Sequence, residues 1–262
     1  ICLASALITA PMGCTREVSD DAVLPTFPKV ADVFTDNFIG LGSNFYFPFA
    51  DAKPDVFSVD MTEGYLSNSS IRIDVPNNTD PSGTYAGAIF RVDGVGRNLT
   101  EFDALTFWAK ASQGVIIGEM GFGTDFGENK YQVTKTGTSL STNWVKYIIP
   151  IPDASKLFEE RGMFWYSAGT QNTGGFGYTF WIDELKFEKL GTIAQPRPVI
   201  CKGEDIVETQ FLGSSVNMAS YGLTQTFNLE SGLNKTVTAA PAYFSFESSN
   251  VDVARVSDLG IL

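Results

Sequence analysis

Four segments of this chain alternate polar and apolar residues with a period of two, and this pattern limits the possible fold more than any other feature. They are residues 70–75 (SIRIDV), 105–110 (LTFWAK), 145–151 (VKYIIPI) and 178–187 (YTFWIDELKF). Successive side chains of a strand point to opposite faces of a sheet, so this period predicts strands with one buried face. Helical signal is confined to one short turn over residues 153–160, with Asp153 as its N-cap. The sequence therefore predicts an all-β chain, folded as an antiparallel β-sandwich of the jelly-roll kind.

Composition narrows the chemistry that such a sandwich can perform. The chain has 262 residues, of which 44% are hydrophobic and 18% charged, so it can bury a substantial core. It contains no histidine, which excludes Ser-His-Asp and Cys-His catalysis and His-ligated zinc. Its formal net charge of −12 opposes binding to a phosphate backbone, so nucleic acid is not an expected partner. A hard cation held by oxygen atoms, such as calcium, remains compatible with this composition.

The N-terminal residues 1–12 (ICLASALITAPM) are apolar, uncharged and too short to span a bilayer. With Gly13 and Cys14 they resemble a bacterial lipoprotein signal, which implies lipidation of Cys14 and a signal remnant over residues 1–14. Residues 15–29 are expected to form a tether. Their Ser-Asp-Asp run at 19–21 resembles the surface-export signal of Bacteroidetes lipoproteins, although an ordinary solvated linker accounts for it equally well. These resemblances imply a lipid-anchored protein at the outer membrane or cell surface. Cys201 then remains alone, so no internal disulfide is expected.

Residues 30–190 carry a series of motifs in a fixed order. They are DVFTDNF at 32–38, SIRI at 70–73, FDALTFWAK at 102–110, NWVKY at 143–147 and FWIDEL at 180–185. In this order they resemble carbohydrate-binding modules of the galactose-binding-like jelly-roll class. The resemblance implies one structural calcium ion held by Asp36, Asp60 and Asp183, with surface or turn carboxylates as the alternative.

The composition changes at residues 191–198 (GTIAQPRP), which are interpreted as a proline-containing hinge. Beyond it, residues 244–260 (FSFESSNVDVARVSDLG) resemble the bacterial Ig-like group 2 signature, with Phe246 where that family often has Trp. This resemblance implies a small Ig-like β-sandwich over residues 199–262, cut short at Leu262, with its valines in the core.

Sugar recognition needs aromatic faces for the C–H groups of the rings, and amides, carboxylates or arginines for the hydroxyls. Residues 118–132 supply both between two expected strands, and residues 162–169 add a second aromatic stretch. The candidate glycan-binding residues are Trp165, Tyr131, Phe122, Asp125, Glu128, Gln132, Tyr85 and Arg91. Trp165 fits the core as well as a sugar contact. Trp108, Trp144 and Trp181 lie within alternating strands and are expected to be structural.

Catalysis is not expected in this chain. The expected strands contain no pair of carboxylates at alternate positions, the spacing that would place two such groups together on one face for glycoside hydrolysis. The sequence favours non-catalytic binding of a polysaccharide or oligosaccharide by a surface-tethered lipoprotein, with an outer-membrane glycan-uptake protein as a further partner. Two alternatives remain open. One is a structural or adhesive cell-surface protein, and the other is the accessory part of a polysaccharide-degrading enzyme whose catalytic domain is missing.

Overall fold

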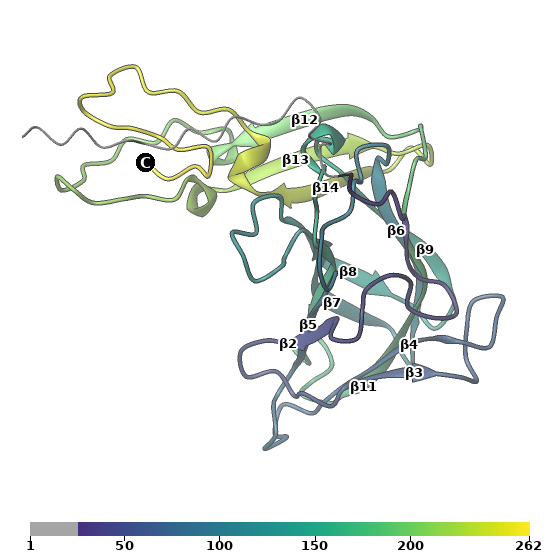
Figure 1. The fold of residues 1–262 in the computed structure, drawn as a ribbon. Helices are drawn as coiled ribbons and strands as arrows, with labels where there is room; N and C mark the ends of the chain where they lie inside the picture. The colour runs from purple at the N-terminus through teal and green to yellow at the C-terminus, as the bar shows by residue number, and fades with distance from the viewer. Residues whose placement is uncertain (1–25) are drawn as a thin grey trace, which may run out of the picture.

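The computed structural model describes residues 26–262, and these fold almost entirely as strands in two antiparallel sheets (Figure 1). The all-β sandwich predicted from the alternation is therefore confirmed. Cys14, the signal remnant and the tether up to residue 25 lie outside the described residues. Within residues 26–262, no helix has the length and apolar character needed to cross a membrane.

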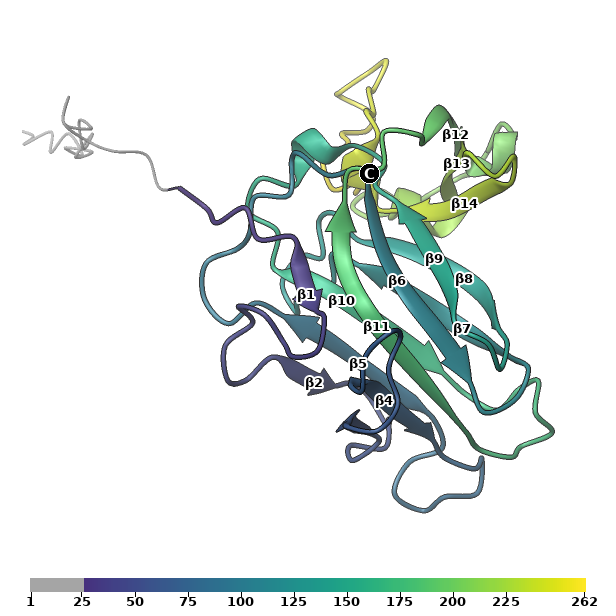
Figure 2. The ribbon, with the colours of Figure 1, turned by 90° about the vertical axis from the view of Figure 1, so that its right-hand side faces the viewer.

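The first sheet has six strands and contains all four of the alternating segments. In spatial order it comprises β3 (Phe57–Asp60), β4 (Ser70–Val75), β11 (Tyr178–Glu188), β6 (Ala104–Ala111) and β9 (Val145–Pro150), with β1 (Asp32–Phe34) paired to β11. Figure 2 looks onto β11, β6 and β9, with the last three strands of the chain above them. The period of two places one set of side chains, such as Phe180 and Ile182, in the core.

The second sheet has eight strands and packs its inner face on the first. In spatial order it comprises β12 (Ala194–Ile200), β13 (Leu223–Asn228), β14 (Asn234–Ala239), β8 (Val133–Leu140), β7 (Val115–Phe122), β10 (Gly162–Ala168), β5 (Ala86–Arg91) and β2 (Tyr46–Pro48). Four single turns of 3-10 helix complete the fold: η1 (Ala154–Lys156), η2 (Cys201–Gly203), η3 (Met218–Tyr221) and η4 (Pro241–Tyr243). Asp153 caps η1 by accepting the N–H of Ser155, as the sequence predicts.

The core between the sheets is rich in phenylalanine. Phe90, Phe164 and Phe180 are fully buried in one continuous apolar cluster. Burying each such side chain stabilises the fold by about 1.5–3 kcal/mol. A buried cation fixes the N-terminal edge of the sandwich, because the Arg97 guanidinium donates to the carbonyl oxygens of Asp32 at 2.7 Å and of Ile39. Burial lowers the pKa of Arg97 to about 10, so the group stays charged near neutral pH.

The C-terminal part differs from the separate Ig-like domain that the sequence predicts. Most of the expected hinge is strand β12, and β14 pairs with β8 through Thr238 opposite Thr134 and Ala239 opposite Val133. The eight-stranded sheet therefore runs without a break into residues 194–262, here called the C-terminal segment. Phe227 and Val237 of this segment belong to the same buried cluster as the sandwich. The physical reason is that Val133 and Thr134, at the start of β8, gain backbone partners and that Phe227 and Val237 are buried by the same pairing.

The Ig-like signature at residues 244–260 does not form the structure that the resemblance implies. None of the named strands falls within it, and Val251 and Val253 are exposed instead of buried. The short tract between β14 and this signature turns away from the sheet as η4. Residues 244–260 therefore contribute no strand to either sheet in the described structure.

Candidate functional site

The outer face of the eight-stranded sheet, here called the binding face, is crossed by one row of residues in register. The row runs through Phe47, Ile89, Trp165, Gly121, Thr134 and Thr238, one from each of six neighbouring strands. Their chain neighbours, such as Phe90, Tyr166 and Val133, point into the core. Alternation within each strand therefore directs the row away from the core.

Trp165 belongs to this row but offers no ring face to a ligand, because only 5% of the residue is exposed. Its indole Nε1 donates to the carbonyl of Val133 at 3.4 Å, across the neighbouring strand β7. Gly121 of β7 leaves room for the indole because it has no side chain. A Cβ atom at this position would lie only 2.8 Å from the indole nitrogen. The prediction that Trp165 stacks on a sugar is therefore not supported by its position, and Trp165 packs as part of the sheet.

A cluster of aromatic and polar groups lies on the binding face beside the loop of residues 123–132. Phe126 is 54% exposed and meets the ring of Phe47 edge-on, with ring centroids 5.6 Å apart. The Arg91 guanidinium lies 4.8 Å from the centroid of Phe47 and donates to the carbonyl of Asp125 at 3.0 Å. The loop is held by its own polar groups, because the Asn129 side chain accepts the N–H of Asp125. The apolar surface of this cluster is thus displayed by a fixed loop.

A cavity of about 250 Å³ opens next to this cluster, and charged side chains line it. Asp125, Glu128 and Tyr131, all predicted glycan-binding residues, are among its walls, with Lys156 and Arg161. These groups supply both donors and acceptors, as the recognition of hydroxyl pairs requires. Gln132, the next predicted residue of the loop, lines a neighbouring cavity.

Glu160 is the buried acid of this cavity. Burial raises its pKa to about 7, although its Oε1 accepts the backbone N–H groups of Gly162 at 2.7 Å and of Arg161 at 2.9 Å. Those two bonds fix the carboxylate against the start of β10. Sequence reasoning did not single out Glu160, and the adjacent Glu159 and Glu160 give no pattern that distinguishes the buried acid from the exposed one.

The remaining predicted residues lie elsewhere. Tyr85 is at the opposite end of β5, where it donates to the carbonyl of Phe49 at 3.0 Å and lines a cavity of about 600 Å³ with Ser167 and Gln171. Phe122 is fully buried in the core and cannot contact a ligand, which corrects its assignment as a glycan-binding residue. Of the predicted glycan-binding residues, those of the loop of residues 123–132 lie near Arg91, whereas Tyr85 lies at a separate place.

The outer face of the six-stranded sheet carries the three tryptophans that the sequence predicts to be structural. Trp108, Trp144 and Trp181 are each partly exposed there. Tyr65 stacks on Trp108 with ring centroids 3.7 Å apart, and the Lys110 ammonium lies 5.1 Å from the ring of Trp181. The alternation within a strand could have placed Trp108 and Trp181, because each directly follows a buried phenylalanine, Phe107 or Phe180, and so faces outward.

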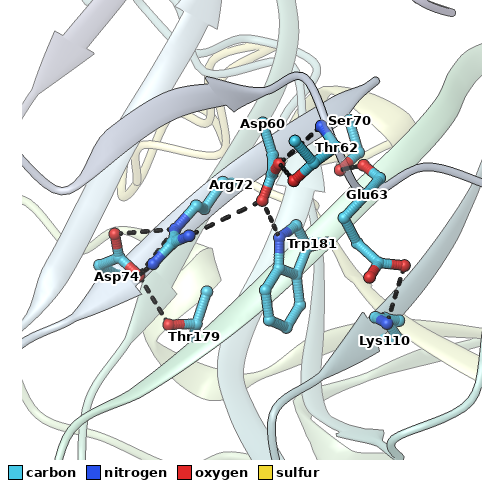
Figure 3. Close-up of polar contacts among 9 residues, drawn as sticks. All are labelled: Asp60, Thr62, Glu63, Ser70, Arg72, Asp74, Lys110, Thr179 and Trp181. Atoms are coloured by element: carbon cyan, nitrogen blue, oxygen red, sulfur yellow. Dashed lines mark hydrogen bonds and ion pairs between the residues drawn. The ribbon is translucent and has the colours of Figure 1, made fainter. Parts of the chain in front are cut away.

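The polar groups of this second face are paired with one another (Figure 3). Arg72 bonds to Asp74, which also accepts the Thr179 hydroxyl at 2.6 Å, and Lys110 pairs with Glu63 at 2.9 Å. Few of these side chains are left free to bind a ligand. We therefore take the face of the eight-stranded sheet, and not this one, as the candidate site.

The three carboxylates assigned to calcium do not gather into one metal site. Asp60 accepts from the Trp181 indole at 3.0 Å and from Thr62 (Figure 3). Asp183, almost fully buried, accepts the N–H groups of Tyr65 and Glu184, each at 2.7 Å. Over residues 26–262, no three His, Cys, Asp or Glu side chains lie together in an arrangement that could hold a metal ion. Asp36, Asp60 and Asp183 therefore do not fit a shared calcium ion, and calcium binding stays a prediction without a described site.

Comparison with known protein families identifies the family of this β-sandwich. The sequence profile described as Carbohydrate binding domain 30 matches residues 32–189, more than half of the chain. The chain belongs to this family. Its carbohydrate-binding domain 30 comprises the six-stranded sheet and the part of the eight-stranded sheet from β2 to β8, while β12, β13 and β14 follow it. The predicted carbohydrate-binding module is thereby confirmed at the level of the family.

Solved structures of carbohydrate-binding modules resemble the domain at low identity. A family 30 module is 18% identical, with a TM-score of 0.43 over 60% of this chain and 97% of that one. A family 11 module from Clostridium thermocellum, solved with a β-1,3-1,4-mixed-linked tetrasaccharide, is 14% identical, with a TM-score of 0.42 over 61% and 96%. A β-1,2-glucanase from Parabacteroides distasonis is 12% identical, with a TM-score of 0.38 over 76% and 29%. No curated protein matches the chain.

Proposed function

We propose that this chain is a non-catalytic binding protein for a neutral polysaccharide, which it holds on the binding face beside the loop of residues 123–132. The observation that carries the proposal is the exposed ring of Phe126, which packs on Phe47 and belongs to the same loop as Asp125 and Glu128 of the charged cavity. An aromatic surface covers the apolar face of a sugar ring, and the adjoining carboxylates and ammonium groups bind its hydroxyls. The acidic balance of the chain, with a net charge of −12, disfavours a polyanionic ligand.

The test is affinity electrophoresis of the chain through gels that contain mixed-linkage β-glucan, xyloglucan, laminarin, galactomannan or hydroxyethyl cellulose. We expect retardation by at least one of them and at least about tenfold weaker binding after Phe126→Ala, the loss that about 1.4 kcal/mol produces. Phe211→Ala is the matched control, because Phe211 is 90% exposed and lines none of the cavities described above. Unaltered mobility in every gel would contradict the proposal, as would equal retardation of both variants. No new reducing ends should form on incubation with the retained polysaccharide.

We further propose that Cys14 anchors the chain to a membrane by a lipid and displays the binding domain at the cell surface. The Gly13-Cys14 pair and the tether that follows support this. The test is metabolic labelling with a clickable fatty acid in a bacterial host that processes lipoproteins. We expect label on the native chain and none on Cys14→Ser, while Cys201→Ser keeps the label. Equal labelling of the native chain and Cys14→Ser would refute the anchor.

A further inference from the structure

The C-terminal segment is fixed against the loop that borders the binding face. The N–H of Ala240 donates to the carbonyl of Gln132 at 2.9 Å, and the Tyr243 hydroxyl donates to the carbonyl of Tyr131 at 3.1 Å. The rings of Tyr131 and Tyr243 also pack together, with centroids 5.6 Å apart. Together with the β14–β8 pairing, these contacts hold residues 238–243 in one position relative to the loop.

The row of residues on the binding face continues into this segment. Thr134 of β8 lies opposite Thr238 of β14, and Thr238 lies opposite Thr224 of β13. Thr238 is exposed, and its neighbours Val237 and Ala239 are buried, so it points to the same side as the row. The binding face therefore extends past residue 189, where the match to carbohydrate-binding domain 30 ends.

Two more cavities lie along this junction and adjoin the first. One, of about 350 Å³, is lined by Glu128 and Lys130 from the loop and by Asn217, Ala219 and Thr238 from the C-terminal segment. The other, of about 340 Å³, is lined by Lys130 and Lys156 on one side and by Glu247 and Asp258 on the other. Lys130 borders all three cavities, and the two that the C-terminal segment also lines are here called the junction groove.

Four of the charged side chains that line these three cavities have no polar partner among the described residues, unlike the paired groups on the outer face of the six-stranded sheet. Within residues 26–262, none of the ion pairs or side-chain hydrogen bonds involves Lys156, Glu128 or Glu159, and the Lys130 ammonium contacts only the ring of Tyr131. By contrast, Arg72 and Lys110 are each held by a carboxylate. Uncommitted donors and acceptors of both signs suit the hydroxyl pairs of a neutral sugar.

We propose that the C-terminal segment forms the second wall of the junction groove and that this groove holds additional sugar units of the same glycan chain, beyond those on the binding face. This inference rests on the proposed function. It assigns the ligand to a class, a neutral glycan chain several units long, and it gives residues outside the family domain a direct part in recognition. Asn217, Ala219 and Glu247 then determine affinity for long ligands and leave that for short ones unchanged.

The test uses the full chain and measures dissociation constants by calorimetry for fragments of two, four and six units cut from the polysaccharide that retards it. Ala219→Tyr narrows the groove, and Glu247→Ala removes an acceptor from its C-terminal wall. We expect each to weaken hexasaccharide binding by at least about tenfold and to change disaccharide binding by less than about twofold, because the disaccharide stays on the binding face. Ala194→Tyr is the matched control, since Ala194 is exposed on β12 and lines none of these cavities.

The outcomes separate the two proposals. If the native chain binds no polysaccharide, the proposed function fails and this inference fails with it. If the native chain binds but Ala219→Tyr, Glu247→Ala and Ala194→Tyr all keep its affinity for the hexasaccharide, the inference alone is overturned. Equal losses for the disaccharide and the hexasaccharide would also overturn it. Melting temperatures within about 2 °C of the native value identify variants that keep the fold.

Discussion

The indole Nε1–H of Trp181 donates to Oδ2 of Asp60 at 3.0 Å, joining β11 to β3 across the outer face of the six-stranded sheet (Figure 3). The intervening strand β4 adds Arg72, whose guanidinium lies 3.7 Å from the same carboxylate oxygen. The Trp181 hydrogen bond, with those from Thr62, lowers the pKa of Asp60 from 3.8 to about 2. This face is thus held together by ionised groups on neighbouring strands.

The first prediction is that Asp60→Asn reduces stability at neutral pH and flattens its acid dependence. A carboxyl whose pKa is depressed on folding stabilises the folded state above its unfolded pKa, and this contribution disappears as the pH falls from about 4 to about 2. Urea unfolding at pH 2, 3, 5 and 7 measures the effect. Asp55→Asn, at an exposed carboxylate, is the control and should follow the native curve. Parallel curves for the native chain and Asp60→Asn would refute the assignment.

For Glu160, the predicted change of stability with pH has the opposite sign to that for Asp60. Its pKa rises from 4.5 to about 7 on folding, so the folded chain binds a proton more readily than the unfolded chain does. Stability should therefore fall as the pH rises from about 4.5 to about 7. Glu160→Gln keeps an oxygen to accept the N–H groups of Arg161 and Gly162 and removes the titration. We expect this variant to lack that fall and to exceed the native chain in stability at pH 8, with Glu159→Gln unaltered.

Trp165→Ala tests the buried position of this tryptophan. Removing a buried Trp side chain costs about 3–5 kcal/mol, so the melting temperature should drop markedly. If Trp165 were instead an exposed surface that stacks on a sugar, the substitution would abolish glycan retention and leave the melting temperature unchanged. Acrylamide quenching supplies an independent measurement: loss of Trp165 should remove the least accessible part of the fluorescence, because the other three tryptophans are partly exposed.

A chelator tests the calcium prediction directly. Because protein donors occupy the carboxylates of Asp60 and Asp183, we expect 5 mM EDTA (about a hundredfold excess over protein) to leave the melting temperature unchanged. Asp36→Ala should behave in the same way with and without the chelator. A fall of several degrees that added calcium restores would show that these residues rearrange around the ion or that another site holds it.

The strands could be predicted from the sequence because each depends on local alternation. Residues 70–75 form β4 with the expected bounds, and residues 178–187 lie within β11. The burial of Trp165 could not be predicted in this way, since it depends on Gly121 in a neighbouring strand more than 40 positions away. The loop cluster was found in part, because Asp125, Glu128 and Tyr131 are close in sequence. Its partners Phe47 and Lys156 come from distant segments that only the fold brings there.

The β14–β8 pairing also determines where the eight-stranded sheet leaves its open edges. Without β14, strand β8 would present free N–H and C=O groups on which another chain could add a strand. With β12–β14 in place, the end strands of the sheet are β12 and β2, and both contain proline: Pro196 and Pro198 in β12, and Pro48 in β2. Proline has no N–H to donate, so an edge strand that contains proline pairs poorly with a strand from another chain. The C-terminal segment thus ends the sheet in a strand whose prolines oppose edge-to-edge pairing with another copy.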